Sequence, residues 1–192
     1  MLVLIDHQPW VAFAVDSIDR NLLINNLVGI AEVAKALQVP TVLTTVGASG
    51  GPLRDPIFGV LSEIFPDTAP IDRVSTNAWA DIKPAVEATG RRSLVMAGLW
   101  TEVCVAQTAL SAINDGYRVY VLSDCCGAVS KEAHEDAKVR MSQAGATPIN
   151  WVALAAEWTP DYTSDIRYAI NGHLVRRAGA VGAAIEYIIA QS

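Results

Sequence analysis

The chain has 192 residues and a formal net charge of −6, from 14 Lys and Arg against 20 Asp and Glu, which argues against nucleic acid as a partner. Hydrophobic residues make up 52% of the chain and charged residues only 18%, so we expect part of the surface to be covered in a homo-oligomer. No apolar run approaches the ~18 residues of a membrane-spanning helix, and no membrane partner is expected.

The length and the start of the chain set two further expectations. We expect residues 1–192 to form a single domain, because this length fits one domain with a large core. The first residues, MLVLID, enter a strand without a basic segment or a cleavage site, so no export signal is predicted. The three cysteines, two of them adjacent at Cys125 and Cys126, form no disulfide framework and indicate a reducing, cytoplasmic setting.

The first predicted strand, residues 2–5, ends on the polar residues Asp6, His7 and Gln8. Open α/β sheets bind their ligands at the carboxyl ends of parallel strands, so these side chains are candidates for a site. The alternative is that Asp6 only caps the next helix or turn.

The following stretch alternates helix and strand. Apolar residues at helical spacing predict a helix over 21–37, and 41–45 reads as the second strand. The turn-rich segment 47–56 either forms part of a pocket wall or is a surface excursion, and a short helix is expected around 58–65.

Arg73 lies in an irregular segment, with a short strand expected near Ile71. An isolated arginine in a loop is usually a solvated surface charge, and taken alone Arg73 would be read that way. Asn77 and Trp79 follow it, and a helix over 82–89 leads to the next strand.

Residues 93–117 are the stretch around which the chain is organised. An apolar strand at 94–97 is followed by a turn at Gly98 and by a helix with Thr101 as its predicted N-cap. Cys104 would then be the third helical residue, where free N–H groups and the helix dipole favour a thiolate. A strand, turn and helix that present a nucleophile at a sheet edge are a recurring catalytic device.

Cys125 or Cys126 is a rival nucleophile, because both follow the predicted strand 119–122. Small buried side chains under a turn explain the two residues better, since no helix begins immediately there. A polar helix over 130–144 comes next, with His134 expected on its solvent side.

The last part of the chain is predicted to be mostly helical, with a strand at 147–152 and helices at 153–158, from 162 onward and at 175–190. The helix from Tyr162 is expected to be interrupted at Asn171 and Gly172, and His173 there has no evident partner. Residues from about 160 to 192 form a C-terminal helical extension whose apolar end either packs on the core or docks on a neighbouring subunit.

The alternation of strands and helices predicts an α/β fold, a three-layer α-β-α sandwich with a mainly parallel, Rossmann-like sheet. A nucleotide-binding function is disfavoured, because no G-x-G-x-x-G or Walker-type loop follows any strand.

Three segments of the chain resemble the isochorismatase-like cysteine hydrolases, and within them the YcaC-like branch. They are LIDHQ at the first strand, R-x-x-x-N-A-W at residues 73–79, and AGLWTEVCVAQTALSAINDGY in the central strand and helix. The likeness extends over nearly the whole chain, including SDCCGA and MSQAGA. It implies an isochorismatase-like fold, a large homo-oligomer and a cis peptide bond between Leu99 and Trp100.

The resemblance also implies a role for each catalytic residue. Cys104 would be the nucleophile and Asp6 the general base, and the backbone N–H groups of Trp100 and Cys104 would form the oxyanion hole. Arg73 stands where the family has a lysine. A guanidinium cannot shuttle protons, so Arg73 would act by charge alone and would make Asp6 a poorer base.

The expected substrate is a small molecule, bound by Gln8, Trp10, Asn77 and Trp79. The tryptophans, with Trp100, would form pocket walls that suit something small, flat or apolar.

Two hypotheses on function follow. The leading one is a metal-independent hydrolase of a small amide or related C–N bond, acting through a thioester on Cys104, because acyl transfer needs a nucleophile, a proton acceptor and oxyanion donors. The zinc-binding members have an Asp-x-His pair after the second strand, which residues 44–49 lack, so no metal or other cofactor is expected. The alternative is a weakened or inactive homologue that serves as a binding or assembly protein.

Overall fold

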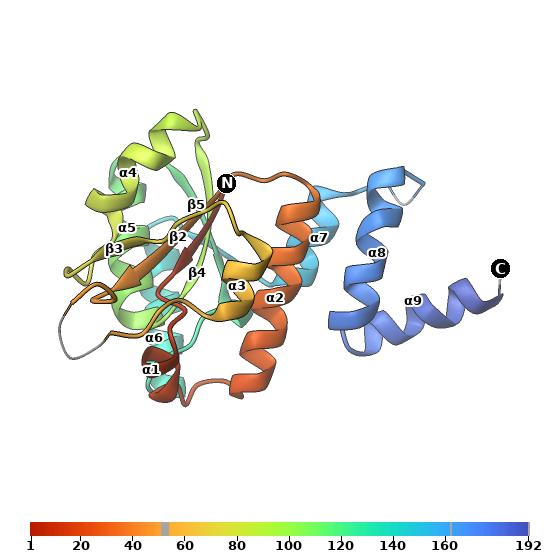
Figure 1. The fold of residues 1–192 in the computed structure, drawn as a ribbon, viewed down its shortest axis with the longest axis horizontal. Helices are drawn as coiled ribbons and strands as arrows, with labels where there is room; N and C mark the ends of the chain where they lie inside the picture. The colour runs from red at the N-terminus through yellow and green to blue at the C-terminus, as the bar shows by residue number, and fades with distance from the viewer. Residues whose placement is uncertain (51–53, 162, 192) are drawn as a thin grey trace.

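The apolar runs of the sequence form one six-stranded parallel sheet (Figure 1), in a computed structural model that describes residues 1–50, 54–161 and 163–191. The strand order is β3-β2-β1-β4-β5-β6. The strands are β1 (Leu2–Ile5), β2 (Thr41–Val46), β3 (Ile71–Arg73), β4 (Ser93–Gly98), β5 (Arg118–Leu122) and β6 (Thr147–Ile149). β1 pairs with β2 on one side and β4 on the other, and all four of its side chains are fully buried because both faces of the sheet are covered.

Helices cover both faces of this sheet, which confirms the predicted three-layer α-β-α sandwich. They are α1 (Pro9–Phe13), α2 (Arg20–Ala36), α3 (Gly59–Ile64), α4 (Trp79–Ala88), α5 (Ala106–Asn114), α6 (Lys131–Gln143) and α7 (Trp151–Trp158). In Figure 1, α4, α5 and α6 lie on one side of the sheet and α2, α3 and α7 on the other. The chain proceeds from β1 outward to β2 and β3, then returns to β4 beside β1. This reversal makes the carboxyl ends of β1 and β4 the place where such folds bind ligands.

A glycine at the end of β4 allows the two central strands to approach closely. A Cβ atom on Gly98 would lie 2.5 Å from the carbonyl oxygen of Ile5 and 2.6 Å from its Cβ atom. The absence of a side chain therefore brings the end of β4 against the end of β1, and the residues that follow each strand meet there.

Several predicted boundaries were wrong, including the start of the last helix, which is Ala180 and not residue 175. β6 ends at Ile149 and α7 begins at Trp151, because the side chain of Asn150 caps this helix by accepting the N–H of Ala153 at 2.8 Å. α4 begins at Trp79, three residues earlier than expected. The interruption expected at residues 171–172 is absent from α8 (Asp165–Arg177), and the break comes at Gly179, which has a φ of 55°.

The C-terminal extension consists of α8 and α9 (Ala180–Gln191). α8 lies beside α2, whereas α9 projects away from the sheet (Figure 1). The expectation that His173 lacks a partner was wrong, because its Nδ1 lies 3.1 Å from Oε2 of Glu32 on α2. Val181, Tyr187 and Ile188 leave much of the outer surface of α9 apolar. Tyr162 lies outside the described residues, and no helix described is long and apolar enough to span a membrane.

Candidate active site

Asp6 is the first residue after β1 and is fully buried. Its φ of 55° is unusual for a residue other than glycine, and it turns the chain sharply at the strand end. One carboxylate oxygen accepts the hydroxyl of Thr44 on the neighbouring strand at 2.7 Å. A buried carboxylate requires further partners, since burial of an unpaired charge is very costly.

Arg73 supplies those partners from the end of β3. Its Nη1 and Nη2 atoms donate to the two carboxylate oxygens of Asp6 at 2.8 and 2.7 Å, and the side chains are 1% and 0% exposed. Nη1 also donates to the carbonyl of Thr45 at 3.1 Å, and Nη2 to that of Thr76 at 3.4 Å. The reading of Arg73 as a solvated surface charge is therefore wrong: it forms a buried, bidentate ion pair.

Cys104 lies on a single π-helical turn, Thr101–Val105, between β4 and α5. Trp100, not the predicted Thr101, is the N-cap, so Cys104 is the fourth residue of the turn instead of the third. The thiol lies close enough to Asp6 and Arg73 for both groups to shift its pKa. The three residues expected to carry the chemistry thus form one buried cluster.

The helix start was expected to favour a thiolate at Cys104, but burial outweighs that effect. Burial raises the pKa of Cys104 to about 12, the neighbouring carboxylate of Asp6 acts in the same direction, and Arg73 only partly opposes them. Because Arg73 is paired with Asp6, its positive charge stabilises a Cys104 thiolate only in part. Burial also disfavours the guanidinium, but the bonds to Asp6 outweigh it and the net pKa of Arg73 is raised. Cys104 is therefore a thiol in contact with a carboxylate that can accept its proton.

The turn before Cys104 has the cis peptide bond between Leu99 and Trp100 that the resemblance implied. The N–H of Thr101 donates to the carbonyl of Gly127 at 2.8 Å, which ties this turn to the one after β5. The role of the Trp100 and Cys104 N–H groups as an oxyanion hole stays a prediction.

Trp10 and Trp100 pack against each other. Their rings meet edge to face with centroids 6.1 Å apart, and the indole N–H of Trp100 donates to the carbonyl of Val11 at 2.8 Å. The indole nitrogen of Trp10 is buried without a hydrogen-bond partner among the described residues. Buried donors are normally paired, so this N–H lacks the acceptor that such groups usually have.

The other predicted substrate contacts are occupied by the protein itself. The side chain of Gln8 is fully buried, donates to the carbonyl of Asp55 at 2.7 Å and accepts the N–H of Val46 at 2.8 Å. It thereby ties the end of β2 to the segment before α3. The role of Gln8 in substrate binding stays a prediction.

Asn77 and Trp79 are likewise engaged with α5 and the residue after it. Asn77 donates to the hydroxyl of Ser111 at 2.9 Å and accepts the N–H of Trp79 at 3.0 Å. The indole of Trp79 donates to Asp115 at 2.8 Å. These bonds hold α4 against α5, and the structure does not bring either side chain into the Asp6 cluster.

Cys125 and Cys126 are fully buried under the turn after β5, as the competing interpretation predicted. Burial raises the pKa of Cys126 to about 12 and that of Cys125 well above its ordinary value. His7 lies behind them, with its Nε2 3.3 Å from the carbonyl of Cys125.

His134 makes a contact that the sequence did not predict. It was expected on the solvent side of its helix, but it is half-buried and its Nδ1 lies 2.9 Å from the hydroxyl oxygen of Thr101. Its position three residues before Ala137 and seven before Met141, both buried, places it on the inner face of α6. This spacing was the signal that could have identified it.

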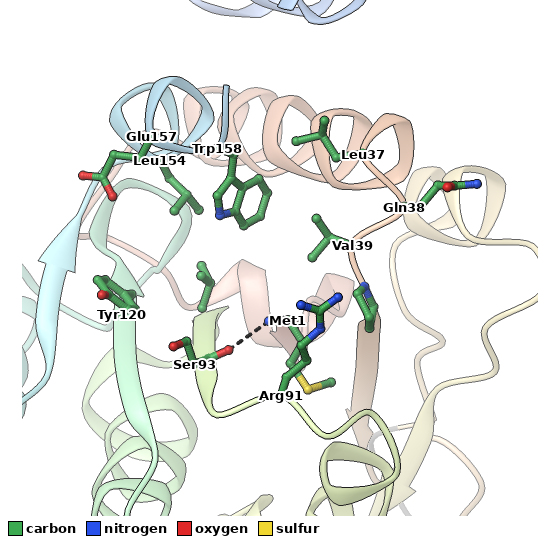
Figure 2. Close-up of a pocket in the computed structure, with 12 residues that line it drawn as sticks. Met1, Leu37, Gln38, Val39, Arg91, Ser93, Tyr120, Leu154, Glu157 and Trp158 are labelled. Atoms are coloured by element: carbon green, nitrogen blue, oxygen red, sulfur yellow. Dashed lines mark hydrogen bonds between the residues drawn. The ribbon is translucent and has the colours of Figure 1, made fainter. Parts of the chain in front are cut away.

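A cavity of about 350 Å³ lies at the opposite edge of the sheet (Figure 2), near the start of the strands. Met1, Ser93, Tyr120 and Trp158 line it, so it is separate from the cluster at the strand ends. Within the described residues, no group of three or more His, Cys, Asp or Glu side chains forms a metal-binding cluster.

Comparison with known proteins places this geometry in a family. The isochorismatase domain model matches residues 1–152. The probable hydrolase YcaC of Escherichia coli is 39% identical over 168 residues, which cover 86% of this chain and 80% of the relative. Isochorismatase domain-containing protein 2 of Xenopus laevis is 29% identical over 121 residues, covering 60% of this chain and 55% of that protein.

Solved structures agree with this assignment. YcaC from Pseudomonas aeruginosa, with hexane-2,5-diol and covalent acrylamide, has a TM-score of 0.91 at 32% identity and covers 97% of this chain and 93% of its own. The octameric YcaC hydrolase of Escherichia coli, of unknown specificity, has a TM-score of 0.92 at 34% identity, with 100% and 94% covered. The chain therefore belongs to the isochorismatase family.

Proposed function

We propose that this protein is a metal-independent cysteine hydrolase that cleaves a small amide or a related C–N bond through a thioester on Cys104. The general class, hydrolase, follows from family membership. The observation that carries the finer proposal is the buried contact of Cys104 with the Asp6–Arg73 pair. It combines a nucleophile with a proton acceptor inside a site shielded from water.

The first half-reaction forms the thioester. Asp6 takes the proton of Cys104 as the sulfur attacks the carbonyl carbon, and the carbonyl π electrons move onto the oxygen. The N–H groups of Trp100 and Cys104 stabilise that oxyanion. As the intermediate collapses, the C–N bond breaks and the amine leaves with the proton that Asp6 carried.

The second half-reaction consumes water. Asp6, again a carboxylate, takes a proton from a water molecule as the oxygen of that water attacks the thioester carbon. The tetrahedral intermediate collapses, the C–S bond breaks, and Cys104 recovers its proton from Asp6. Amide and water thus become carboxylic acid and amine, and the enzyme is unchanged.

Arg73 contributes charge and position to both halves. Its guanidinium holds both oxygens of Asp6 and stays protonated, so it moves no proton. When the proton of Cys104 passes to Asp6, the ion pair loses its anion, and Arg73 then faces the new thiolate. The positive charge therefore stabilises the sulfur anion more once Asp6 is protonated than in the resting ion pair, as differential stabilisation of a transition state requires.

The relatives support reactivity and self-association. In Pseudomonas aeruginosa YcaC, acrylamide is covalently bound, which fits a reactive nucleophile in this family. YcaC of Escherichia coli is octameric. The exposed apolar side chains of α9 and the 52% hydrophobic composition support a homo-oligomer here too.

A small molecule with a flat or apolar group is the proposed substrate. The Trp10 and Trp100 rings form the wall for it, and the unpartnered indole N–H of Trp10 can donate to an acceptor on it. Gln8, Asn77 and Trp79 support this site by fixing the segments around it.

The alternative, a binding or assembly protein with weakened chemistry, draws on one observation. The bidentate bond to Arg73 occupies both oxygens of Asp6, which limits how strongly this carboxylate can draw the proton from a thiol whose pKa is raised to about 12.

The proposal is tested by incubating the protein with a panel of small amides and measuring the release of ammonia. We expect the wild-type protein and Cys126→Ala to release ammonia, Cys104→Ala to release none, and a stalled reaction to carry an acyl mass on the Cys104 peptide. Ammonia release that persists in Cys104→Ala would exclude the thioester route. Binding of the same amides without any acyl mass or ammonia would favour the alternative.

A further inference from the structure

The buried hydroxyl of Thr101 is satisfied by a side chain from a distant part of the sequence. Thr101 is the first residue of the π-helical turn and lies between Trp100 and Cys104, which would supply the oxyanion hole. It is fully buried, and its hydroxyl oxygen lies 2.9 Å from Nδ1 of His134. A buried hydroxyl without such a bond would be destabilising, so the contact holds the side chain in place.

His134 is well suited to this contact. Burial and the charge of Lys138 lower its pKa, with Glu135 opposing them, so the imidazole is neutral at pH 7. In either tautomer, Nδ1 of a neutral imidazole can complete a hydrogen bond with a hydroxyl, as acceptor or as donor. His134 also stands in the first turn of a capped helix, because the hydroxyl of Ser130 accepts the N–H of Ala133 at 3.1 Å.

The backbone of Thr101 is fixed by other bonds. Its N–H donates to Gly127, and its carbonyl accepts the N–H of Ala106 at the start of α5. The His134 bond adds a tie to α6, on the other side of the turn. Together these bonds determine the orientation of the peptide planes around Thr101.

We infer that His134 is a positioning residue: through Thr101, it fixes the direction in which the N–H groups of Trp100 and Cys104 point. The inference rests on the proposed function, in which these groups bind the oxyanion. Misplacing a reacting group by about 1 Å can cost roughly 10²-fold in rate, so a contact that acts only on the turn can control the chemistry.

Alkylation by two different electrophiles distinguishes the contribution of the oxyanion hole from the reactivity of the thiol. When the Cys104 thiolate adds to the β-carbon of acrylamide, the C=C electrons shift to an enolate with its negative charge on the amide oxygen, and the α-carbon then takes a proton from water. Iodoacetamide loses iodide in a direct displacement and develops no oxyanion. The ratio of the two rates at Cys104 therefore reports the oxyanion hole independently of thiol reactivity.

We expect His134→Ala and Thr101→Val to lower the acrylamide-to-iodoacetamide ratio about tenfold, below the ~10²–10³ cost of deleting a whole oxyanion donor. His134→Asn keeps a polar atom near the position of Nδ1 and should restore most of the ratio. Combining His134→Ala with Thr101→Val should add little, because both remove the same bond. Arg140→Ala, an exposed position on the same helix, is the matched control and should leave the ratio unchanged.

An unchanged ratio in both variants, or equal slowing of both electrophiles, would overturn the inference. A wild-type Cys104 that reacts with neither reagent would instead overturn the proposed function. If His134→Ala does not fold, Thr101→Val preserves the test, because valine has nearly the shape of threonine and removes only the hydroxyl. Thermal unfolding of each variant identifies those that have lost their structure.

Discussion

The turns after β4 and β5 place cysteines at the same edge of the sheet, but in different surroundings. A parallel bridge between Leu99 and Gly127 joins the two turns. Burial raises the pKa of both Cys104 and Cys126 to about 12. Cys104 nevertheless contacts a carboxylate and a guanidinium, whereas the hydrogen bond that opposes the shift at Cys126 comes from the backbone of Gly98.

This difference shows what makes a buried cysteine a candidate nucleophile. Burial sets the resting protonation state of both thiols, and a position near a helix start does not overcome it at Cys104. The Asp6–Arg73 pair adds a proton acceptor and a cation that is exposed to the sulfur when the proton leaves. A thiol that lacks this pair is an inert core side chain.

The largest expected effect comes from breaking the ion pair. Arg73→Ala leaves the carboxylate of Asp6 buried without its cation, and loss of one partner of a buried pair costs about 3–5 kcal/mol of unfolding free energy. Removing the cation also raises the pKa of Cys104 further, so its alkylation at a given pH should slow, while Cys126 should not change. Arg73→Lys retains a positive charge, so the pKa and the alkylation rate of Cys104 should stay close to those of wild type. Urea titration and the pH dependence of alkylation measure the two effects.

Lys83→Ala is the control for that comparison, because it breaks an exposed bridge to Asp115 and should hardly affect stability. Superimposable alkylation curves for wild type, Arg73→Ala and Arg73→Lys would show that the cation does not act on Cys104.

Much of this site could be anticipated from the sequence, because carboxyl ends of parallel strands meet at one edge. Asp6 and Cys104 were therefore expected to be neighbours before any geometry was known. The pKa of Cys104 was not predictable, since it depends on burial by distant segments. The local sequence pattern indicated only the start of a helix, which lowers the pKa of Cys104 by less than burial raises it.

The C-terminal extension illustrates the same limit in the fold. Asn171 and Gly172 favour a helix break by intrinsic propensity, at a cost of about 1 kcal/mol for glycine. α8 nevertheless continues through them, and tertiary contacts of His173 and Arg177 with Glu32 hold it against α2. Local propensity was overridden by packing that the sequence does not reveal.

A second prediction concerns the turn that carries Cys125 and Cys126. Burial lowers the pKa of His7 to about 4, so its stabilising effect is present above the unfolded pKa of 6.5 and is lost as the pH falls through 4. This linkage amounts to about 3 kcal/mol across that window. His7→Gln keeps a donor near the position of Nε2, toward the carbonyl of Cys125, without titrating.

We therefore expect the stability of His7→Gln to fall less steeply than that of wild type between pH 6.5 and 4, as measured by urea unfolding at several pH values. Substitution of the half-buried His134 by Gln provides a comparison. It should change the loss of stability between pH 6.5 and 4, the acid limb of the stability curve, by a smaller amount. Parallel acid limbs for wild type and His7→Gln would contradict the assigned role of His7.

The smallest expected effect tests how closely the two central strands must approach. Alanine at position 98 would place a Cβ atom 2.5 Å from the carbonyl oxygen of Ile5, and backbone cannot move as cheaply as a flexible side chain. Gly98→Ala should therefore cost about 1–3 kcal/mol of unfolding free energy, the usual range for overpacking a core. The strand ends should also separate, which moves Cys104 away from Asp6 and slows amide hydrolysis more than the loss of stability explains. Gly59→Ala, where an added Cβ meets open space, is the control and should leave both quantities nearly unchanged. Wild-type hydrolysis by a folded Gly98→Ala protein would mean that the Asp6–Cys104 contact tolerates a shift of the strands, and the close approach of β1 and β4 would then serve packing alone.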